Sequence, residues 1–239
     1  MIKRITRLDF AHIECKSSIL MQGLPENETT LIGCFAYYIE KDGRNILIDT
    51  GIENIDTVNL TKSSTDDWIR SENEFCLSEN LKVYDISPED IDEVFITHSH
   101  YDHLSGVCSL KKATIYMSDK EYEYLHDNNP HKKFLEDAIE FLENKKKEGK
   151  LILVGEEFAD DGFRCVTVGG HTPGSMLVYI DDNLFTGDNI FLLDSIEKKK
   201  PIGFCNEPEK AETALKLCLK HSGRTFTGHD FKCCKEVEV

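Results

Sequence analysis

Four potential metal ligands lie within eight consecutive residues of the sequence, at positions 97–104. These residues read Thr-His-Ser-His-Tyr-Asp-His-Leu, and the ligands among them are His98, His100, Asp102 and His103. Imidazole nitrogens combined with a carboxylate oxygen are the donors that zinc and related divalent metals prefer. The stretch therefore predicts a metal site. The alternative is a solvated, histidine-rich turn that binds no metal.

Three further potential ligands follow along the chain, each in a glycine-rich setting after an apolar run. They are His171 in Gly-Gly-His-Thr-Pro-Gly, Asp188 in Thr-Gly-Asp, and His229 in Thr-Gly-His-Asp. Five of the nine histidines thus belong to motifs of this kind. Their presence favours a metal site over a solvated turn.

The residues before the first cluster predict a rigid support for it. Residues 91–97 form a β-branched and aromatic run that is typical of a buried strand. The preceding Ser-Pro-Glu-Asp, residues 87–90, is typical of a capping-box turn. We therefore expect the first ligand loop to extend from the end of a strand.

The pattern of the remaining chain indicates an α/β domain built in layers. Further strands are expected at residues 2–12, 30–40, 44–49, 113–118, 150–155, 163–168, 175–181 and 183–186, and helices at 131–148 and 208–220. The turn Lys41-Asp-Gly43 predicts a hairpin. A helix is also expected around Trp68, inside the polar segment 52–80. Strands that precede helices in each half of the chain are typical of α/β architecture.

Length and composition exclude several kinds of partner. The 239 residues show no linker or repeat, so we expect one domain spanning residues 1–239. A formal net charge of −16 opposes binding to nucleic acid, whose phosphates require clustered Lys and Arg.

The sequence also indicates where the protein is located. It contains no run of 18 apolar residues that would predict a membrane span, and its charged N-terminus is unlike a signal peptide. The nine scattered cysteines favour reduced thiols. We expect a cytoplasmic protein, and no feature of the sequence predicts an oligomeric state.

The ordered motifs resemble those of the metallo-β-lactamase superfamily. Its signature is a His-x-His-x-Asp-His loop followed by a single His, an Asp and a last His. The resemblance runs from Asp49 to Asp230 and includes the turn Asp-Thr-Gly at residues 49–51. It implies a four-layer αββα sandwich with metals at one edge, between the sheets. The roles that it implies are one metal on His98, His100 and His171, a second on Asp102, His103 and His229, Asp188 as a bridge, and Asp49 as the group that orients a ligand imidazole.

This resemblance implies a hydrolase with two divalent cations and a small-molecule substrate. Zinc is the favoured ion, with iron, manganese and cobalt as alternatives. Two such ions lower the pKa of bound water to about 7 and polarise the bond under attack. The implied reaction is attack of a metal-bound hydroxide on an ester or lactone carbonyl. Asp102 would then carry the proton to the leaving group.

The chain is most similar to the N-acyl-homoserine lactonase branch of this family, in length, in ligand set and in the final Gly-His-Asp. Those lactonases typically place a Tyr three residues after the bridging Asp, whereas this chain has Phe191. A phenyl ring donates no hydrogen bond. The missing donor is therefore replaced by the metals, by Tyr101 or by Tyr37, or the substrate differs. We take Tyr101 and Phe191 as candidate pocket residues.

One segment is predicted to lie over the site, and other functions stay open. Residues 119–150 come between two core strands and are a candidate helical cap. The histidines of this segment, His126 and His131, are expected to be surface residues rather than ligands.

Two alternative functions stay open. A thioesterase or phosphodiesterase of the same superfamily is one of them. The other is a non-catalytic metal or redox sensor that uses the cysteines together with the dinuclear site. The vicinal pair Cys233 and Cys234 is a candidate redox-sensitive or adventitious metal site, and the alternative is a plain exposed or packed pair.

Overall fold

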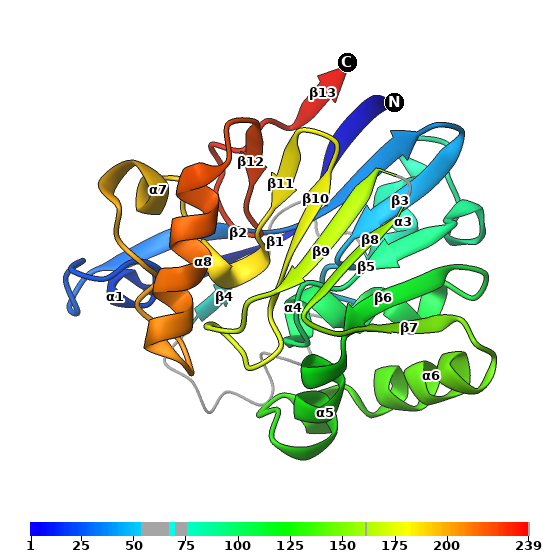
Figure 1. Cartoon of the computed structure of the whole chain (residues 1–239), viewed down its shortest axis with the longest axis horizontal. Coiled ribbons are helices and arrows are strands. Elements are labelled where there is room, and N and C mark those ends of the chain that lie inside the picture. The colour runs from blue at the N-terminus through cyan, green and yellow to red at the C-terminus, as the bar shows by residue number, and fades with distance from the viewer. Residues whose placement is uncertain (54–66, 70–75, 161, 239) are drawn as a thin grey trace.

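Two β-sheets form the centre of the fold, and helices lie on their outer faces (Figure 1). The computed structural model describes residues 1–53, 76–160 and 162–238, together with the backbone of residues 67–69. Figure 1 places α8 beside one sheet and α5 and α6 beside the other. The order of layers is therefore helix, sheet, sheet, helix.

The larger sheet joins the N-terminal strands to a parallel segment. Its path runs through β13 (Glu236–Glu238), β1 (Ile2–Lys16), β2 (Thr29–Lys41), β3 (Arg44–Ile48), β5 (Glu93–Phe95), β6 (Thr114–Ser118) and β7 (Leu151–Val154), and β4 (Asp67–Ile69) pairs with β1. The pairings β3–β5, β5–β6 and β6–β7 are parallel. Parallel neighbours need crossover connections, and the segments between these strands carry helices.

The smaller sheet contains the C-terminal strands. Its order is β12 (Arg224–Phe226), β11 (Asn183–Phe185), β10 (Met176–Ile180), β9 (Phe163–Thr167) and β8 (Glu157–Asp160). Only the β11–β12 pairing in this described sheet is parallel. The remaining elements are α1 (Ser17–Leu20), α3 (Leu77–Lys82), η1 (Pro88–Asp90), α4 (Tyr101–Leu104), η2 (Ser105–Ser109), α5 (Asp119–Asp127), η3 (Lys132–Phe134), α6 (Glu136–Lys147), η4 (Gly187–Asn189), α7 (Asp194–Lys198) and α8 (Pro208–Lys220).

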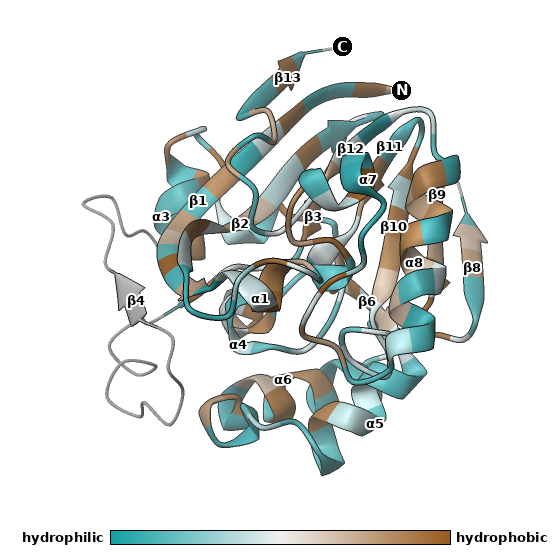
Figure 2. Cartoon of the chain, turned by 90° about the vertical axis from the view of Figure 1, so that its left-hand side faces the viewer, coloured by the Kyte–Doolittle hydropathy of each residue, from teal (hydrophilic) through white to brown (hydrophobic). Residues whose placement is uncertain are grey.

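Alternation along the strands explains why four layers form. Successive side chains of a strand point to opposite faces, so one strand can serve two cores. On β2, one face contributes Cys34, Ala36 and Tyr38 to the core under the helices α3 to α6, and the other contributes Phe35, Tyr37 and Ile39 to the core between the sheets. On the smaller sheet, Leu177 packs with Leu215 of α8 in a third core. Figure 2 shows α8 in both hydrophobic and hydrophilic colours, as expected of a helix with one buried face.

Most of the expected strands are present, with shifted ends. The Lys41-Asp-Gly43 turn closes a hairpin in which Lys41 pairs with Arg44. Asp42 (φ 51°) and Gly43 (φ 77°) both have positive φ, as a two-residue type I′ turn requires. Ser87 caps η1 with a capping box, as predicted. The helix expected at 131–148 begins only at Glu136, after the short η3.

The helix expected around Trp68 is wrong. Residues 67–69 form β4, whose Trp68 pairs with Ile13 of β1. One edge of the long β1 pairs with β2, and the backbone N–H and C=O groups of its other edge can pair with an added strand. The rest of that polar segment, residues 54–66 and 70–75, lies outside the described residues. Three further short strands, β8, β12 and β13, were not predicted.

Candidate metal centre

The candidate ligands follow strands at one edge of the two sheets. Their positions are as follows: Asp49 after β3, His98 to His103 after β5, His171 after β9, Asp188 after β11, and His229 after β12. Because β3 and β5 are parallel, as are β11 and β12, the carboxyl ends of each pair meet at the same edge. Ligands in layered α/β proteins commonly bind at such edges.

All seven predicted ligands come together in two buried groups. The first group contains His98, His100, His171 and Asp188, and the second contains Asp102, His103 and His229. Within each group the potential ligand atoms lie within 4.8 Å of one another. Residues from distant parts of the sequence therefore converge on one place, and their role as metal ligands stays a prediction.

The carboxylate of Asp188 lies between the histidines of the first group and those of the second. Its Oδ2 is 3.6 Å from Nε2 of His98 and 3.3 Å from Nε2 of His171. Its Oδ1 is 3.2 Å from Nε2 of His103 and 2.9 Å from Nε2 of His229. One oxygen thus faces each group, which is the geometry that a bridging ligand needs.

Asp49 fixes the orientation of His103. Its Oδ2 accepts a hydrogen bond from Nδ1 of His103 (2.8 Å), which turns Nε2 of that ring toward Asp188. The same carboxylate accepts hydrogen bonds from the backbone N–H (2.7 Å) and hydroxyl (2.8 Å) of Thr97. The backbone of Asp49 has φ 60°, a left-handed conformation that Asp tolerates better than most residues. The predicted orienting contact of Asp49 is therefore present.

Replacing Asp49 with asparagine is expected to weaken metal binding by about 10- to 100-fold. The backbone N–H of Thr97 can only donate, and Nδ1 of His103 donates when Nε2 faces the site, so the amide NH₂ of Asn would face one of these two donors unfavourably. Competition titration with a chromophoric chelator measures the dissociation constant for the metal. Asp127→Asn, at an exposed position, is the control. Unchanged affinity in the Asp49 variant would show that this contact has no part in binding.

Two other candidate ligand rings are oriented by backbone carbonyls. Nδ1 of His229 donates to the carbonyl oxygen of Gly33 (2.6 Å), and Nδ1 of His171 donates to that of Phe204 (3.3 Å). In both rings Nε2 is then the nitrogen that faces the site. Such outer contacts are the usual means by which proteins fix the tautomer of a metal-binding histidine.

Two glycines of the motifs permit close approach. At Gly228, an added Cβ would lie 2.9 Å from Cε1 of His103 and 3.2 Å from Oδ1 of Asp188. At Gly187, where φ is +49°, it would lie 2.3 Å from Oγ1 of Thr97. Glycine precedes His229 and Asp188 in the sequence because there is no room for a side chain at these two positions.

The unpaired nitrogens at the site fit a divalent cation. In the part of the chain that the structure describes, the buried Nε2 atoms of His98 and His103 have no hydrogen-bond partner. Leaving such an atom unpaired costs about 1–3 kcal/mol. Nδ1 of His100 and Nε2 of His171 also face each other at 2.9 Å. Nitrogen and carboxylate donors converging in this way support binding of a divalent metal ion.

Burial and the neighbouring charges shift the pKa values of the site residues in different directions. Burial lowers the pKa of His98, which keeps the ring in the neutral form that binds metals. Burial opposes charge on His103 too, but Asp188, Asp102 and Asp49 outweigh it and raise its pKa. For Asp188, burial favours protonation, yet the neighbouring histidines hold its pKa well below the usual range. The carboxylate is therefore ionised and can bind a cation.

The candidate pocket residues pack against the ligands or near them. The ring of Phe191 lies 5.4 Å from that of His171 and 5.4 Å from that of His229, so it contacts both groups. Tyr101 is buried in the helix-covered core, with its ring 6.3 Å from that of Phe134. The hydroxyl of Tyr37 donates a hydrogen bond to the carbonyl oxygen of Thr227 (2.6 Å), so this donor is already engaged by the backbone.

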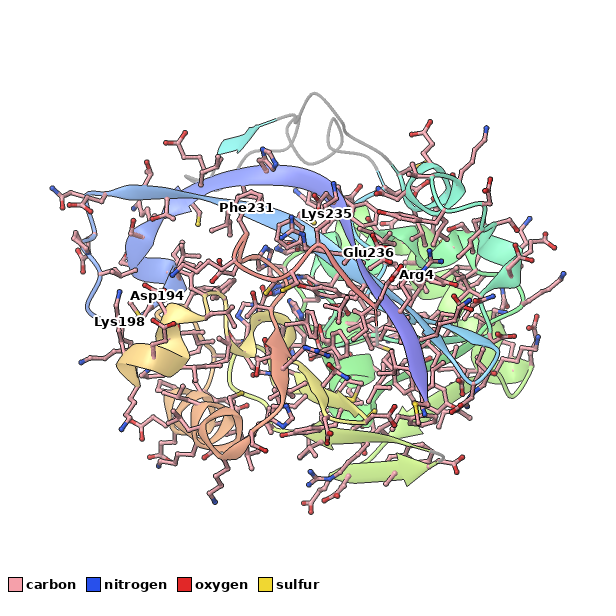
Figure 3. All side chains as sticks on the ribbon, turned by 90° about the horizontal axis from the view of Figure 1, so that it is seen from above. Arg4, Asp194, Lys198, Phe231, Lys235 and Glu236 are labelled. Carbon is pink, nitrogen blue, oxygen red and sulfur yellow. The ribbon has the colours of Figure 1, made fainter. Side chains whose placement is uncertain are left out.

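A small pocket of about 220 Å³ reaches His229 from the surface. Leu31, Leu192 and Phe231 form apolar parts of its wall, and Asp194 lies at its margin. Figure 3 labels Phe231, Asp194 and the neighbouring Lys198 of α7, which pairs with Asp194. The wall is therefore mixed, with apolar side chains next to an ion pair.

His131 is a site residue that the sequence did not reveal. Its ring stacks on that of His100, with centroids 4.8 Å apart and planes 19° apart. His131 is half-buried and belongs to neither candidate ligand group, but this ring contact places it beside the candidate site. His126 is half-buried, and its Nδ1 contacts the carbonyl oxygen of Tyr122. The predicted helical segment 119–150 contains α5 and α6 and touches the site through His131; its role as a cap stays a prediction.

The sequence matches known proteins along much of its length. A family model described as the metallo-beta-lactamase superfamily matches residues 29–223. A protein of Methanocaldococcus jannaschii named "Probable metallo-hydrolase" is 31% identical over 156 residues, which cover 65% of this chain and 65% of that protein. The chain thus spans less than two thirds of the length of that relative.

Lactone hydrolases are also similar to the chain. An N-acyl homoserine lactonase of Bacillus thuringiensis is 25% identical over 221 residues, 86% of this chain and 84% of that protein. The structure of an N-acyl homoserine lactone hydrolase, with N-hexanoyl-L-homoserine at its catalytic metal centre, gives a TM-score of 0.79 at 18% identity. That match covers 97% of this chain and 95% of the other. At 18% identity, this structural similarity shows that the two chains share a fold.

Among the helices of the described residues, none has the length and the apolar character that a membrane span requires.

Proposed function

Because the chain belongs to the metallo-beta-lactamase superfamily, we propose that it is a dinuclear metal-dependent hydrolase that opens lactones or cleaves esters. The observation that carries the proposal is the position of Asp188, with one carboxylate oxygen toward each group of histidines. A single-metal site would need only one of these faces. The superfamily itself hosts several hydrolytic reactions, so the substrate follows from the site and not from the fold.

The residues present would hold two zinc ions. The proposed ligands are His98, His100 and His171 for one ion, Asp102, His103 and His229 for the other, and Asp188 for both. Iron, manganese and cobalt share this preference for imidazole and carboxylate and are the alternatives. When bound, two such ions supply a nucleophilic water at neutral pH and polarise the substrate carbonyl.

Asp102 is the proposed proton carrier. Its Oδ2 lies 3.5 Å from Nε2 of His103 and 3.6 Å from Nε2 of His229, so it faces the centre of the site. Burial alone would raise its pKa, but the two histidines outweigh burial and lower it. As a carboxylate, Asp102 can accept a proton from the attacking water and return it to the leaving alkoxide. A lactone would then open to a hydroxy acid.

The walls of the site favour a small, partly apolar substrate. Phe191 packs on His171 and His229 and offers no hydrogen-bond donor to a carbonyl oxygen. The apolar side chains of Leu31, Leu192 and Phe231 line the pocket that ends at His229. Lactonases among the relatives act on N-acyl homoserine lactones, and such a substrate combines an apolar chain with a reactive ester.

The test is the initial rate of N-acyl-homoserine lactone opening by zinc-loaded protein. We expect kcat/KM of about 10⁴ M⁻¹s⁻¹ or more, the lower end of ordinary enzymes, and loss of this activity after chelation. A null result with both metals bound would refute the lactone substrate and leave thioesters and phosphodiesters to be assayed. The sensor alternative predicts metal uptake with a thiol-dependent structural change and no turnover of any ester.

A further inference from the structure

Glu121 is a buried carboxylate that the proposed reaction does not use. It lies in the first turn of α5 and is 0% exposed. Its Oε1 accepts hydrogen bonds from the backbone N–H (2.8 Å) and hydroxyl (2.6 Å) of Ser99. Its Oε2 accepts hydrogen bonds from the hydroxyl of Thr172 (2.6 Å) and the backbone N–H of Gly174 (3.0 Å). All four donors are neutral groups, so the carboxylate is not held there as part of an ion pair with them.

These four hydrogen bonds connect the two loops that carry one of the ligand groups. Ser99 stands between His98 and His100, and Thr172 directly follows His171. Glu121 therefore spans the gap across which Nδ1 of His100 and Nε2 of His171 face each other at 2.9 Å. His103, a ligand of the other group, is oriented separately by Asp49.

The start of α5 is packed tightly onto the His171 loop. Oγ of Ser118, the residue that caps α5, accepts a hydrogen bond from the N–H of Glu121 (3.0 Å) and donates one to the carbonyl oxygen of Gly174 (2.6 Å). A Cβ at Gly174 would lie 2.1 Å from the backbone nitrogen of Glu121. The helix N-terminus also favours a negative charge at this position. The carboxylate is thus fixed relative to both loops.

We propose that Glu121 is a positioning residue that sets the separation of these two loops and so controls the affinity of the metal site formed by His98, His100 and His171. The inference rests on the proposed dinuclear function. A carboxylate is the group that suits the position, because the backbone N–H groups of Ser99 and Gly174 can only donate. Glutamine would present an NH₂ group to one of these loops and push the loop away.

The experiment is zinc titration of metal-free wild-type protein and of the Glu121→Gln variant. We expect two tight sites in the wild type and, in the variant, one site weakened by about 10- to 100-fold with the other unchanged. Crystals of the variant at limiting zinc should give an anomalous peak only beside Asp102, His103 and His229. Glu123→Gln, at an exposed position of the same helix, should behave as wild type.

A second variant keeps the test decisive if Glu121→Gln does not fold. Thr172→Val has nearly the same shape and removes the hydroxyl that donates to Glu121, so the same site should weaken, by a smaller factor. The inference is overturned if both sites keep wild-type affinity. It is also overturned if both weaken equally together with a fall in the Tm of the metal-free protein, since that would be a general structural effect. Wild-type protein without two tight sites would refute the proposed function itself.

Discussion

Replacing Asp188 with alanine is expected to reduce the metal content from two ions per chain to at most one and to lower kcat/KM by more than about 100-fold. Its two oxygens face His98 and His171 on one side and His103 and His229 on the other. Without this carboxylate, two divalent cations about 3.5–4 Å apart would repel each other with little compensation. Loss of a group that only supports a ligand already costs 10- to 100-fold, and loss of a shared ligand should cost more.

Metal analysis after exhaustive dialysis and initial rates on the substrate that the wild type turns over measure both effects. Asp127→Ala, at the exposed end of α5, is the matched control and should keep two ions and full activity. An Asp188→Ala protein that retains two ions and more than about a tenth of the wild-type kcat/KM would refute the bridging role. Chelated wild-type protein provides the zero-activity reference.

Asp102→Asn is expected to lower kcat by about 10²–10⁴-fold, the usual contribution of a general acid or base, while most of the metal remains bound. Asparagine keeps one oxygen that can bind a cation but cannot accept a proton at neutral pH. The loss of turnover should therefore exceed the loss of metal. The measurement is kcat at saturating zinc together with the metal content of the same sample.

Turnover of the Asp102→Asn protein at full metal loading separates two possible roles of Asp102, metal binding and proton transfer. If Asp102 only binds metal, kcat at saturating zinc should recover as metal content recovers. If it carries the proton, kcat stays low in fully loaded protein. A fully metallated and fully active Asp102→Asn protein would exclude the proton-carrying role, and Asp127→Asn controls for the substitution.

The candidate ligands could be identified in the sequence because each stands in a short local motif. These motifs are the turn after β3, the loop after β5, and the Gly-Gly-His, Thr-Gly-Asp and Thr-Gly-His stretches. Their glycines are explained by the space beside His103 and Thr97. The strand at 30–40 and the helix at 208–220 were likewise predicted, because each depends on the residue pattern of a single element.

The remaining features depend on contacts between distant segments. β4 forms because β1 offers it an edge, which no local pattern of residues 67–69 reveals. Glu121 belongs to none of the motifs recognised in the sequence, and His131 was expected to be a surface histidine. Glu121 meets the ligand loops, and His131 meets His100, only because α5 and the turn after it pack against the end of β5. Sequence periodicity carries no information about such packing.

The most direct test of the dinuclear proposal is anomalous X-ray diffraction from wild-type crystals grown with excess zinc. We predict two anomalous peaks about 3.5–4 Å apart, one beside His98, His100 and His171 and the other beside Asp102, His103 and His229, with Asp188 between them. A single peak at saturating zinc, or two peaks that Asp188 does not contact, would contradict it.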